Sequence, residues 1–502
     1  KSNLSWEEVS RIEVNIPDLP GLSIDEGEIR NYPYGDATAH IIGYVGAVSK
    51  GDINEEDPLM AVPGFKIGKS GIEKTLDLDM RGQSGTSEVE VNVVGREIRE
   101  LRKQPATPGK RITLTIDGEL QRLAQNLLAQ HRSASAVIMD AHSGAIFALA
   151  SYPSFDPNTF SKGISAATWE ELLANPANPL TNKAVAGQYP PGSTFKMLTA
   201  MAALKLGKLS PNFGVFCPGH FDFGNTRFHC WKKGGHGHVG LTDAITMSCD
   251  TFFYTLGTML TIDQIAETAR DFGLGQSYGF DLGEERPGLV PDKAWKQKQY
   301  GEIWHPGETI NASIGQGYLL ATPLQLAVMT ARLVNGGFAV KPWLTGVIGD
   351  GPEHQTTWPK MKYNPVHLDM VKHGMVQVVN YERGTAFGSR IKEPGWEMGG
   401  KTGTAQVRRI TMAQRNAGVK NEDLPWQFRH HGLFVAYAPI ENPRYVCAVV
   451  VEHGVGGSIS AAPIAHNLMI ETQRRDPASK PLYTETYNSQ TPPPESAAKK
   501  PI

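Results

Sequence analysis

Cysteine is scarce in this sequence, and neither sign of charge is in clear excess. The 502 residues include only four cysteines, too few for the disulfide framework of a small secreted domain. The formal net charge of −2 at pH 7 argues against a nucleic-acid-binding surface or a polybasic membrane patch. No run of about eighteen apolar residues occurs, so no segment is expected to cross a bilayer.

The composition is that of an ordinary folded protein, and the length allows about three domains. Hydrophobic residues make up 40% of the chain and charged residues 20%, without a disordered or collagen-like bias. Residues 1–107 combine strand-like runs with glycine and proline and contain no catalytic cluster. Strands are predicted there at residues 11–14, 39–45 and 88–94. The proline-containing segment 103–110 marks the boundary to the next domain.

The order of apolar runs after residue 110 predicts an α/β sandwich rather than a barrel. A first strand is followed by a helix that Asp117 starts, with leucines along one face. His142-Ser143-Gly144 between two apolar runs predicts a hairpin. Strands are expected at residues 111–116, 136–140, 145–150, 401–407, 433–437 and 445–451.

Two segments lack such a pattern. The charged stretch 408–431 is long for a hairpin loop, and it is either a mobile flap over a cleft or a solvated excursion. The flap is the favoured interpretation. Residues 476–502 are rich in Pro, Ser, Thr and Lys and have no apolar face, so this tail is predicted to be disordered.

A turn that leads directly into a helix is predicted at Ser193. Pro190 and Pro191 bar a helix before it, and apolar residues recur at helical spacing after it. Ser193 and Lys196 are three residues apart and therefore share a helix face. Helix N-terminal N–H groups stabilise an oxyanion, and a buried lysine loses its proton more readily than an exposed one. The pair therefore suits a nucleophile and its base, although a capping serine and a surface lysine give the same pattern.

Two further polar motifs follow in the chain. Residues 248–250 read Ser-Cys-Asp and open an apolar helix, where an N-cap is the structural alternative. Residues 401–404 read Lys-Thr-Gly-Thr after two glycines and predict the start of an edge strand. A lysine and two hydroxyls beside a glycine suit a substrate carboxylate whose backbone lies along that strand. Ser-x-x-Lys, a Ser-x-Asp variant of Ser-Asp-Asn and Lys-Thr-Gly together form the signature of one class of serine acyl-enzymes.

Three of the cysteines lie close together in the sequence. Cys217 and Cys230 lie between the two serine motifs, and Cys249 lies within the second. These cysteines, with one of the nearby histidines His220, His236 and His238, offer the thiolates and imidazole that tetrahedral zinc prefers. A disulfide between two of the three is the alternative in an oxidising compartment, and it leaves one cysteine unpaired. Cys447, within the run 445–451, is predicted to be a core residue.

With these motifs the chain resembles the penicillin-binding protein transpeptidases, more narrowly the class B, elongation-type penicillin-binding proteins 2 of Gram-negative bacteria. One position departs from the usual pattern, because Asp250 stands where the middle motif has Asn in most of the family. Asp at this place is typical of the elongation-type branch. The resemblance extends over residues 32–46, 71–73, 189–196, 311–323 and 401–404.

The resemblance implies an α/β (α+β) penicillin-binding fold in which helices flank an antiparallel sheet, preceded by a mainly β pedestal. It implies three parts: a pedestal or dimerisation domain at 1–107, a transpeptidase domain at 108–475 and the tail at 476–502. Members of the family carry an N-terminal membrane helix, which we expect to be missing from this chain, and act at the periplasmic face of the inner membrane. Implied partners are a membrane glycosyltransferase and shape-determining elongation proteins.

The implied activity is peptidoglycan D,D-transpeptidation through an acyl-enzyme on Ser193, with β-lactams as inhibitors and carboxypeptidation as a side activity. No catalytic cofactor is implied, but relatives hold a structural zinc at positions matching Cys217, Cys230, His236 and Cys249. The implied catalytic residues are Ser193, Lys196, Ser248, Asp250 and Lys401, and the implied substrate-binding residues are Thr402, Gly403 and Thr404.

Other classes of protein share the three motifs. A β-lactamase needs a base for deacylation, and no glutamate for that step is identifiable in this chain. A β-lactam sensor acylates but does not act on stem peptides. A pure scaffold protein does not require three intact motifs.

Overall fold

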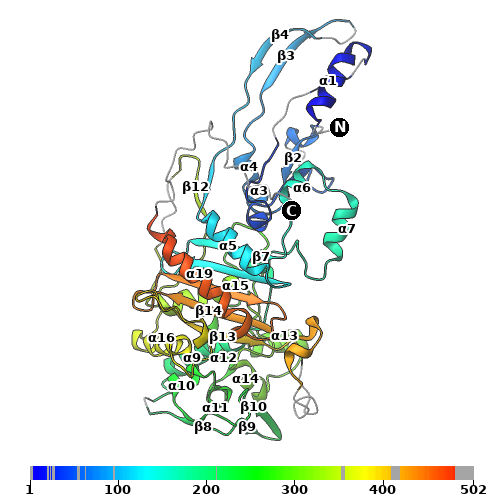
Figure 1. Cartoon of the computed structure of the whole chain (residues 1–502). Coiled ribbons are helices and arrows are strands. Elements are labelled where there is room, and N and C mark those ends of the chain that lie inside the picture. Colours follow the sequence, from blue (N-terminus) through cyan, green and yellow to red (C-terminus); the bar gives the residue numbers. More distant parts are fainter. Residues whose placement is uncertain are drawn as a thin grey trace, which may run out of the picture.

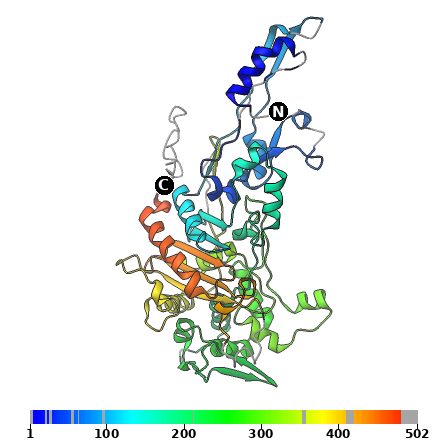
Figure 2. The same ribbon diagram turned by 45° about the vertical axis from the view of Figure 1, so that its right-hand side comes forward.

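The computed structural model describes residues 4–19, 22, 24, 29–53, 57–62, 64–93, 97–210, 212–351, 357–408 and 419–480. Figures 1 and 2 show a narrow N-terminal part that projects from a wider body of helices around a sheet. Within those described ranges, no helix is both long and apolar enough to cross a membrane.

The body is built on a five-stranded antiparallel sheet with the strand order β13-β14-β15-β6-β7. The central strands are buried on both faces, which explains why they are apolar without alternation. The predicted antiparallel sheet with flanking helices is thereby confirmed. The strands are β6 (Ala134–Asp140), β7 (Ile146–Tyr152), β13 (Gly399–Ala405), β14 (His431–Ala438) and β15 (Tyr445–Val451).

Helices cover both faces of this sheet. α5 (Gly118–Leu128) packs on β7, and α19 (Ala462–Arg475) packs on β14 and β15. α15 (Pro323–Val334), which is buried throughout, packs on β6, β14 and β15. Asp117 caps α5 by accepting from two backbone N–H groups, so the predicted helix start is confirmed.

The N-terminal part contains more helix than predicted. Strand 11–14 was expected, but α1 (Trp6–Asn15) forms there, because Ser5 and Glu8 close a reciprocal capping box at its start. Run 39–45 divides into the short helix α2 (Ala39–Ile42) and the start of β1 (Val45–Ala47), which pairs with β2 (Lys66–Gly68). Only the third predicted strand is confirmed, as β3 (Thr86–Val91), which pairs with β4 (Glu97–Gln104).

The N-terminal part is joined to the body by buried polar and aromatic contacts. Gln121 of α5 donates to the carbonyl of Ala37 at 2.7 Å, and Asn182 donates to that of His40 at 3.1 Å. Phe155 and Phe160 pack against Ala39 and its neighbour Tyr44. The helices α6 (Pro157–Lys162) and α7 (Ala166–Ala174) lie beside this junction in Figure 1.

The two segments predicted to lack regular structure are described only in part. Residues 409–418 of the expected flap and 481–502 of the expected tail lie outside the described residues. Beyond that gap the chain is tied down, because Asn421 donates to the carbonyl of Val455 and accepts from the backbone of His430. At the start of the tail, Asp476 accepts a hydrogen bond from the hydroxyl of Tyr445.

Candidate active site

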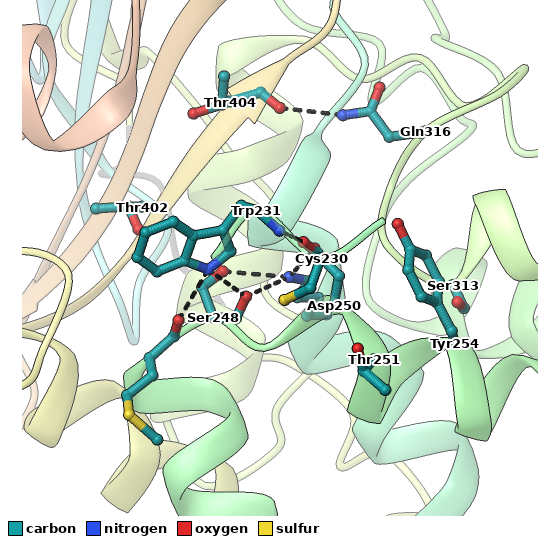
Figure 3. Close-up of polar contacts among 12 residues, drawn as sticks. Cys230, Trp231, Ser248, Asp250, Thr251, Tyr254, Ser313, Gln316, Thr402 and Thr404 are labelled. Atoms are coloured by element: carbon teal, nitrogen blue, oxygen red, sulfur yellow. Dashed lines mark hydrogen bonds and ion pairs between the residues drawn. The ribbon is translucent and has the colours of Figure 1, made fainter. Parts of the chain in front are cut away.

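A cleft of about 620 Å³ lies beside β13, which forms one edge of the sheet. Residues from all three sequence motifs line it, and Figure 3 shows several of them around Trp231. Lys196 and Lys401 are fully buried and do not belong to the lining. The predicted residues on the cleft wall are Ser193, Ser248, Asp250, Thr402, Gly403 and Thr404.

Ser193 lies in a 3₁₀ turn, η4 (Gly192–Phe195), that runs directly into α9 (Lys196–Lys205). The α-helix therefore begins three residues later than predicted. Gly192 has φ +52°, and a Cβ there would lie 2.6 Å from the carbonyl oxygen of Thr404, so only glycine allows this approach to β13. Within the described part of the chain, the Ser193 hydroxyl has no protein hydrogen-bond partner and faces the cleft.

Lys196 connects the first two motifs beneath the cleft. Its Nζ lies 3.2 Å from Ser248 Oγ, 3.0 Å from the Ser248 carbonyl oxygen and 2.7 Å from Asp250 Oδ1. The lysine is 0% exposed, so its charge is compensated by these oxygens rather than by water. The arrangement brings an amine, a hydroxyl and a carboxylate into one hydrogen-bonded group.

Asp250 is the first residue of α11 (Asp250–Met259) and has two partners. Oδ1 accepts from Lys196, and Oδ2 accepts from the backbone N–H of Trp231 at 2.8 Å. Burial raises the pKa of Asp250, and the adjacent Lys196 charge opposes that rise. The carboxylate is thus held between a lysine amine and a backbone N–H group.

Ser248 has an uncommon backbone conformation for a residue other than glycine, with φ +55°. The carbonyl groups of Met247 and Ser248 both accept from the indole N–H of Trp231, at 3.1 and 3.0 Å. Figure 3 shows this indole between Ser248 and Thr402. The strained serine is thus held by hydrogen bonds on its own carbonyl.

The side chains of the third motif lie alternately on the two faces of β13. Thr404 directs its carbonyl off the free edge of the sheet, where the Gln316 amide donates to it at 3.0 Å. In an antiparallel strand the N–H and C=O of one residue point the same way, so the Thr404 N–H also points off this edge toward η4. Thr402 shares a 2.7 Å hydrogen bond with Thr385. The edge thus offers a backbone donor and two hydroxyls to a ligand.

Lys401 points into the protein rather than into the cleft. It is 0% exposed, and its Nζ donates to the carbonyl of Thr402 at 3.1 Å. Burial lowers the pKa of Lys401 well below its usual range, and the nearby charge of Lys196 adds to this effect. Such a lysine is better suited to passing protons than to binding a substrate carboxylate directly.

The structure brings Cys217, Cys230, His236 and Cys249 together behind Ser248, with their ligand atoms within 4.8 Å of one another. All four are buried, and these three cysteines form no disulfide. The His236 Nδ1 atom lies 3.6 Å from Cys217 Sγ and 3.5 Å from Cys230 Sγ. A tetrahedral zinc with bonds of about 2.3 Å to sulfur and about 2.0 Å to nitrogen holds these atoms about 3.5 Å apart.

Two further contacts surround the sulfur atoms of this cluster. A hydrogen bond between two of the thiols lowers the pKa of Cys230 and raises the pKa of Cys249, so that it favours a thiolate at Cys230 alone. The Cys217 thiol donates to the Thr251 hydroxyl oxygen at 3.2 Å, so this hydroxyl lies next to the sulfur. The donor set therefore fits zinc, and with four protein ligands no position remains open for chemistry.

The penicillin binding protein transpeptidase domain family matches residues 134–470, and the penicillin-binding protein dimerisation domain family matches residues 1–114. This chain belongs to the penicillin-binding protein transpeptidases. It is 39% identical over 93% of its length to the peptidoglycan D,D-transpeptidase MrdA of Haemophilus influenzae, of which the match covers 73%. It is also 38% identical over 93% of its length to MrdA of Acinetobacter baumannii, of which the match covers 69%.

Solved penicillin-binding protein structures share the fold. Pseudomonas aeruginosa PBP2 in complex with WCK 5153 has a TM-score of 0.76 and 36% identity, covering 89% of this chain and 91% of that one. Helicobacter pylori PBP2 in complex with MreC has a TM-score of 0.82 and 29% identity, covering 94% and 84%. The resemblance to class B penicillin-binding protein 2 is therefore confirmed.

Three residues of this penicillin-binding protein site were not identified from the sequence. Trp231 adjoins Cys230, and Gln316 lies within the stretch 311–323 that carried the family resemblance, so both had a local signal. Thr385 had none, because its contact with Thr402 depends on how α16 (Pro365–Asn380) and the loop after it lie against β13.

Proposed function

We propose that this chain is a peptidoglycan D,D-transpeptidase that cross-links stem peptides through an acyl-enzyme on Ser193, and that β-lactams inhibit it by acylating the same residue. The observation that carries the proposal is the Ser193 hydroxyl on the cleft wall, which has no hydrogen-bond partner among the described residues. It lies near the buried Lys196–Asp250 pair and beside the edge strand β13. This combination supplies a nucleophile, a base and a peptide-binding edge in one cleft.

The donor stem peptide, ending in D-Ala-D-Ala, binds as an extra strand along β13. Its terminal carboxylate accepts hydrogen bonds from the hydroxyls of Thr402 and Thr404, which lie on the cleft wall. Lys401 is buried, its Nζ donates to the carbonyl of Thr402, and it lies close enough to Lys196 and Asp250 for their charges to act on it. Gly403 lies on the cleft wall and lets β13 pack closely against the Ser193 turn, because a Cβ there would lie 3.0 Å from the Thr194 side chain and 3.1 Å from the Pro191 carbonyl oxygen.

Acylation begins when Lys196 takes the hydroxyl proton of Ser193. Asp250, which Lys196 contacts at 2.7 Å, is the neighbouring group to which the lysine can pass a proton before it acts as the base. The Ser193 oxygen then attacks the penultimate D-Ala carbonyl. The N–H groups of Ser193 and Thr404 stabilise the resulting oxyanion.

The tetrahedral intermediate collapses when the C–N bond to the terminal D-Ala breaks. Ser248, which contacts Lys196 at 3.2 Å, passes a proton to the departing amine. An amine of a neighbouring stem peptide, from diaminopimelate, then attacks the ester carbonyl and releases Ser193 with the cross-link formed. A β-lactam amide follows the first step and stalls at the second.

A covalent adduct on Ser193 is the expected result of brief exposure to a β-lactam. Intact-protein mass should increase by the mass of one drug molecule, and peptide mapping should place the increase on the peptide that contains Ser193. The adduct should persist, and the enzyme should cross-link stem peptides when no drug is present. Rapid loss of the adduct indicates the β-lactamase alternative, and a stable adduct without activity on stem peptides indicates the sensor.

We also propose that Cys217, Cys230, His236 and Cys249 hold a structural zinc ion. The proposal is supported by the donor set, its burial and the sulfur–nitrogen distances of 3.5 and 3.6 Å. Bound zinc would tie these segments of the chain together and would take no part in catalysis. Cys249 lies between Ser248 and Asp250 in the chain, so the cluster braces the second catalytic motif from behind.

The N-terminal part, taken as residues 1–107, is proposed to be a pedestal that binds shape-determining elongation proteins beside a membrane glycosyltransferase. Helicobacter pylori PBP2, which shares this fold, has been solved in complex with MreC, and another similar structure is that of a peptidoglycan synthase complex. Exposed apolar side chains gather on the β3–β4 ribbon, at Val89, Val91, Val93, Ile98 and Leu101. Because peptidoglycan lies outside the cytoplasmic membrane, we place the enzyme at the periplasmic face.

Val89→Asp combined with Val91→Asp is expected to weaken binding of an MreC-type partner at least about ten-fold, because both side chains lie on the same face of β3. Binding can be measured by surface plasmon resonance with immobilised partner. Leu173→Asp on the exposed side of α7 is the matched control and should leave affinity unchanged. Unchanged affinity of the double variant excludes the ribbon as the binding surface.

A further inference from the structure

We infer that Trp231 is a positioning residue for acylation, which fixes both partners of Lys196 from one point in the chain. The inference rests on the proposed acyl-enzyme function. Trp231 lies on the cleft wall, directly after Cys230. It belongs to neither serine motif nor to the strand motif, and its side chain contains no group that can act as nucleophile, acid or base.

The side chain of Trp231 holds the strained backbone of the second motif. Its indole N–H donates to the carbonyls of Met247 and Ser248 at 3.1 and 3.0 Å. Ser248 has φ +55°, a conformation that costs free energy for a residue with a side chain and persists only when neighbours enforce it. The indole is one such neighbour, and the Ser248 carbonyl that it binds is also an acceptor for Lys196 Nζ.

The main chain of Trp231 holds the other partner of Lys196. Its backbone N–H donates to Asp250 Oδ2 at 2.8 Å, while Asp250 Oδ1 accepts from Lys196 at 2.7 Å. One residue therefore orients the Ser248 carbonyl through its side chain and the Asp250 carboxylate through its backbone. Loss of the indole hydrogen bonds lets the Ser248 turn relax, which moves the hydroxyl and the carbonyl that position the base.

Burial alone does not account for this tryptophan. Its side chain is 58% exposed, so it buries less apolar surface than a core aromatic residue. It also lies with its ring centroid 5.5 Å from that of His236, a contact that a ring without the N–H group can keep. Removing the indole N–H alone therefore tests the positioning role while the packing of the ring is kept.

The test replaces Trp231 by β-(3-benzothienyl)alanine, which keeps the shape of tryptophan and lacks the N–H, and in parallel makes Trp231→Phe. Acylation by a fluorescent penicillin is followed at several drug concentrations, so that the rate constant of acylation is separated from the dissociation constant. Thermal unfolding midpoint and metal content by native mass are measured on the same samples. The matched control is the benzothienyl replacement at Trp358, whose indole donates to the Ser143 carbonyl at 3.1 Å away from the cleft.

Both Trp231 variants are expected to lower the acylation rate constant about ten-fold while the dissociation constant, the unfolding midpoint and the metal content stay unchanged. The Trp358 control should remain within two-fold of wild type. An isosteric variant that acylates at the wild-type rate overturns the inference, as does a loss of rate that accompanies loss of metal or of stability. The proposed function is tested separately by the wild-type adduct, which should map to Ser193 whether or not the Trp231 variants acylate slowly. If the wild type forms no adduct, both the proposed function and the inference about Trp231 are wrong.

Discussion

Lys196→Met is expected to lower the rate of β-lactam acylation at least about 1000-fold at pH 7. The change keeps a long apolar stem but removes the amine that contacts Ser248 Oγ at 3.2 Å and Asp250 Oδ1 at 2.7 Å. Ser193 then lacks the base that takes its proton, while the cleft wall keeps its shape. Binding of the drug before acylation should therefore change far less than the acylation rate.

The same variant should lose stability, because Asp250 remains buried without its counter-charge. Breaking a buried ion pair by removing one partner costs about 3–5 kcal/mol, part of which protonation of Asp250 relieves. Adding Asp250→Asn to Lys196→Met removes the unpaired charge and should recover most of the lost unfolding midpoint. It should not recover acylation, and this difference separates the catalytic role of Lys196 from its structural role.

Lys296→Met provides the matched control. Lys296 is also buried and contacts Glu308 Oε1 and Oε2 at 2.6 and 2.7 Å, but it does not line the cleft. We expect its acylation rate to stay within two-fold of wild type, whatever the change in unfolding midpoint. If Lys196→Met acylates within ten-fold of wild type, another group serves as the base and the proposed proton path is wrong.

The sheet and the order of the motifs could be predicted from the sequence because the signals that specify them are local. Uninterrupted apolar runs bounded by turn residues predicted strand 445–451, which is β15 with the same limits. Asp117 was identified as a helix start from its side chain and the leucines that follow. The three cysteines of the cluster were identified by chemical type, since the chain has only one other cysteine, whereas His236 was selected among 15 histidines by the family resemblance.

Features that depend on the tertiary structure were not accessible in this way. The apolar pattern around Val14 predicted a strand, but the segment is a helix that begins with a capping box at Ser5. The alternation of apolar residues carries no information about such a cap, so it could not predict which structure forms. The burial of Lys401 follows from its side of β13 and from what packs there, not from its own motif. The hydrogen bond between Trp231 and Asp250 spans 19 residues and requires the chain between them to turn back.

Cys217→Ala is expected to abolish zinc binding and to destabilise the protein by about 3 kcal/mol or more. The residues around the cluster are short ribbons, β8 (Val215–Cys217) with β11 (Gly237–Val239) and β9 (His220–Phe223) with β10 (Thr226–His229). Two-stranded ribbons are marginal on their own, so the proposed metal is expected to supply much of their stability. Native mass should show one zinc ion in the wild type and none in the variant.

Cys447→Ala makes the same substitution at a buried cysteine of β15 that does not belong to the Cys/His cluster. It should keep its zinc and lose only the free energy of one small core side chain, about 1 kcal/mol. A chelator should lower the unfolding midpoint of the wild type and of Cys447→Ala, but not that of Cys217→Ala. Metal-free wild type with a midpoint that no chelator moves contradicts the zinc proposal.

Loss of the metal should also slow acylation, since Cys249 lies between the two residues that contact Lys196. Without zinc the start of α11 is no longer tied to the ribbon that carries Trp231, and Asp250 and Ser248 lose their fixed spacing. Thiol ligands bind metal as thiolates, so the zinc-dependent part of the stability should shrink as the pH falls and protons compete for sulfur. The proposed structural ion would thereby set the geometry of the proposed base without touching the substrate, and its removal should reduce the acylation rate constant about as much as the loss of the Trp231 N–H does.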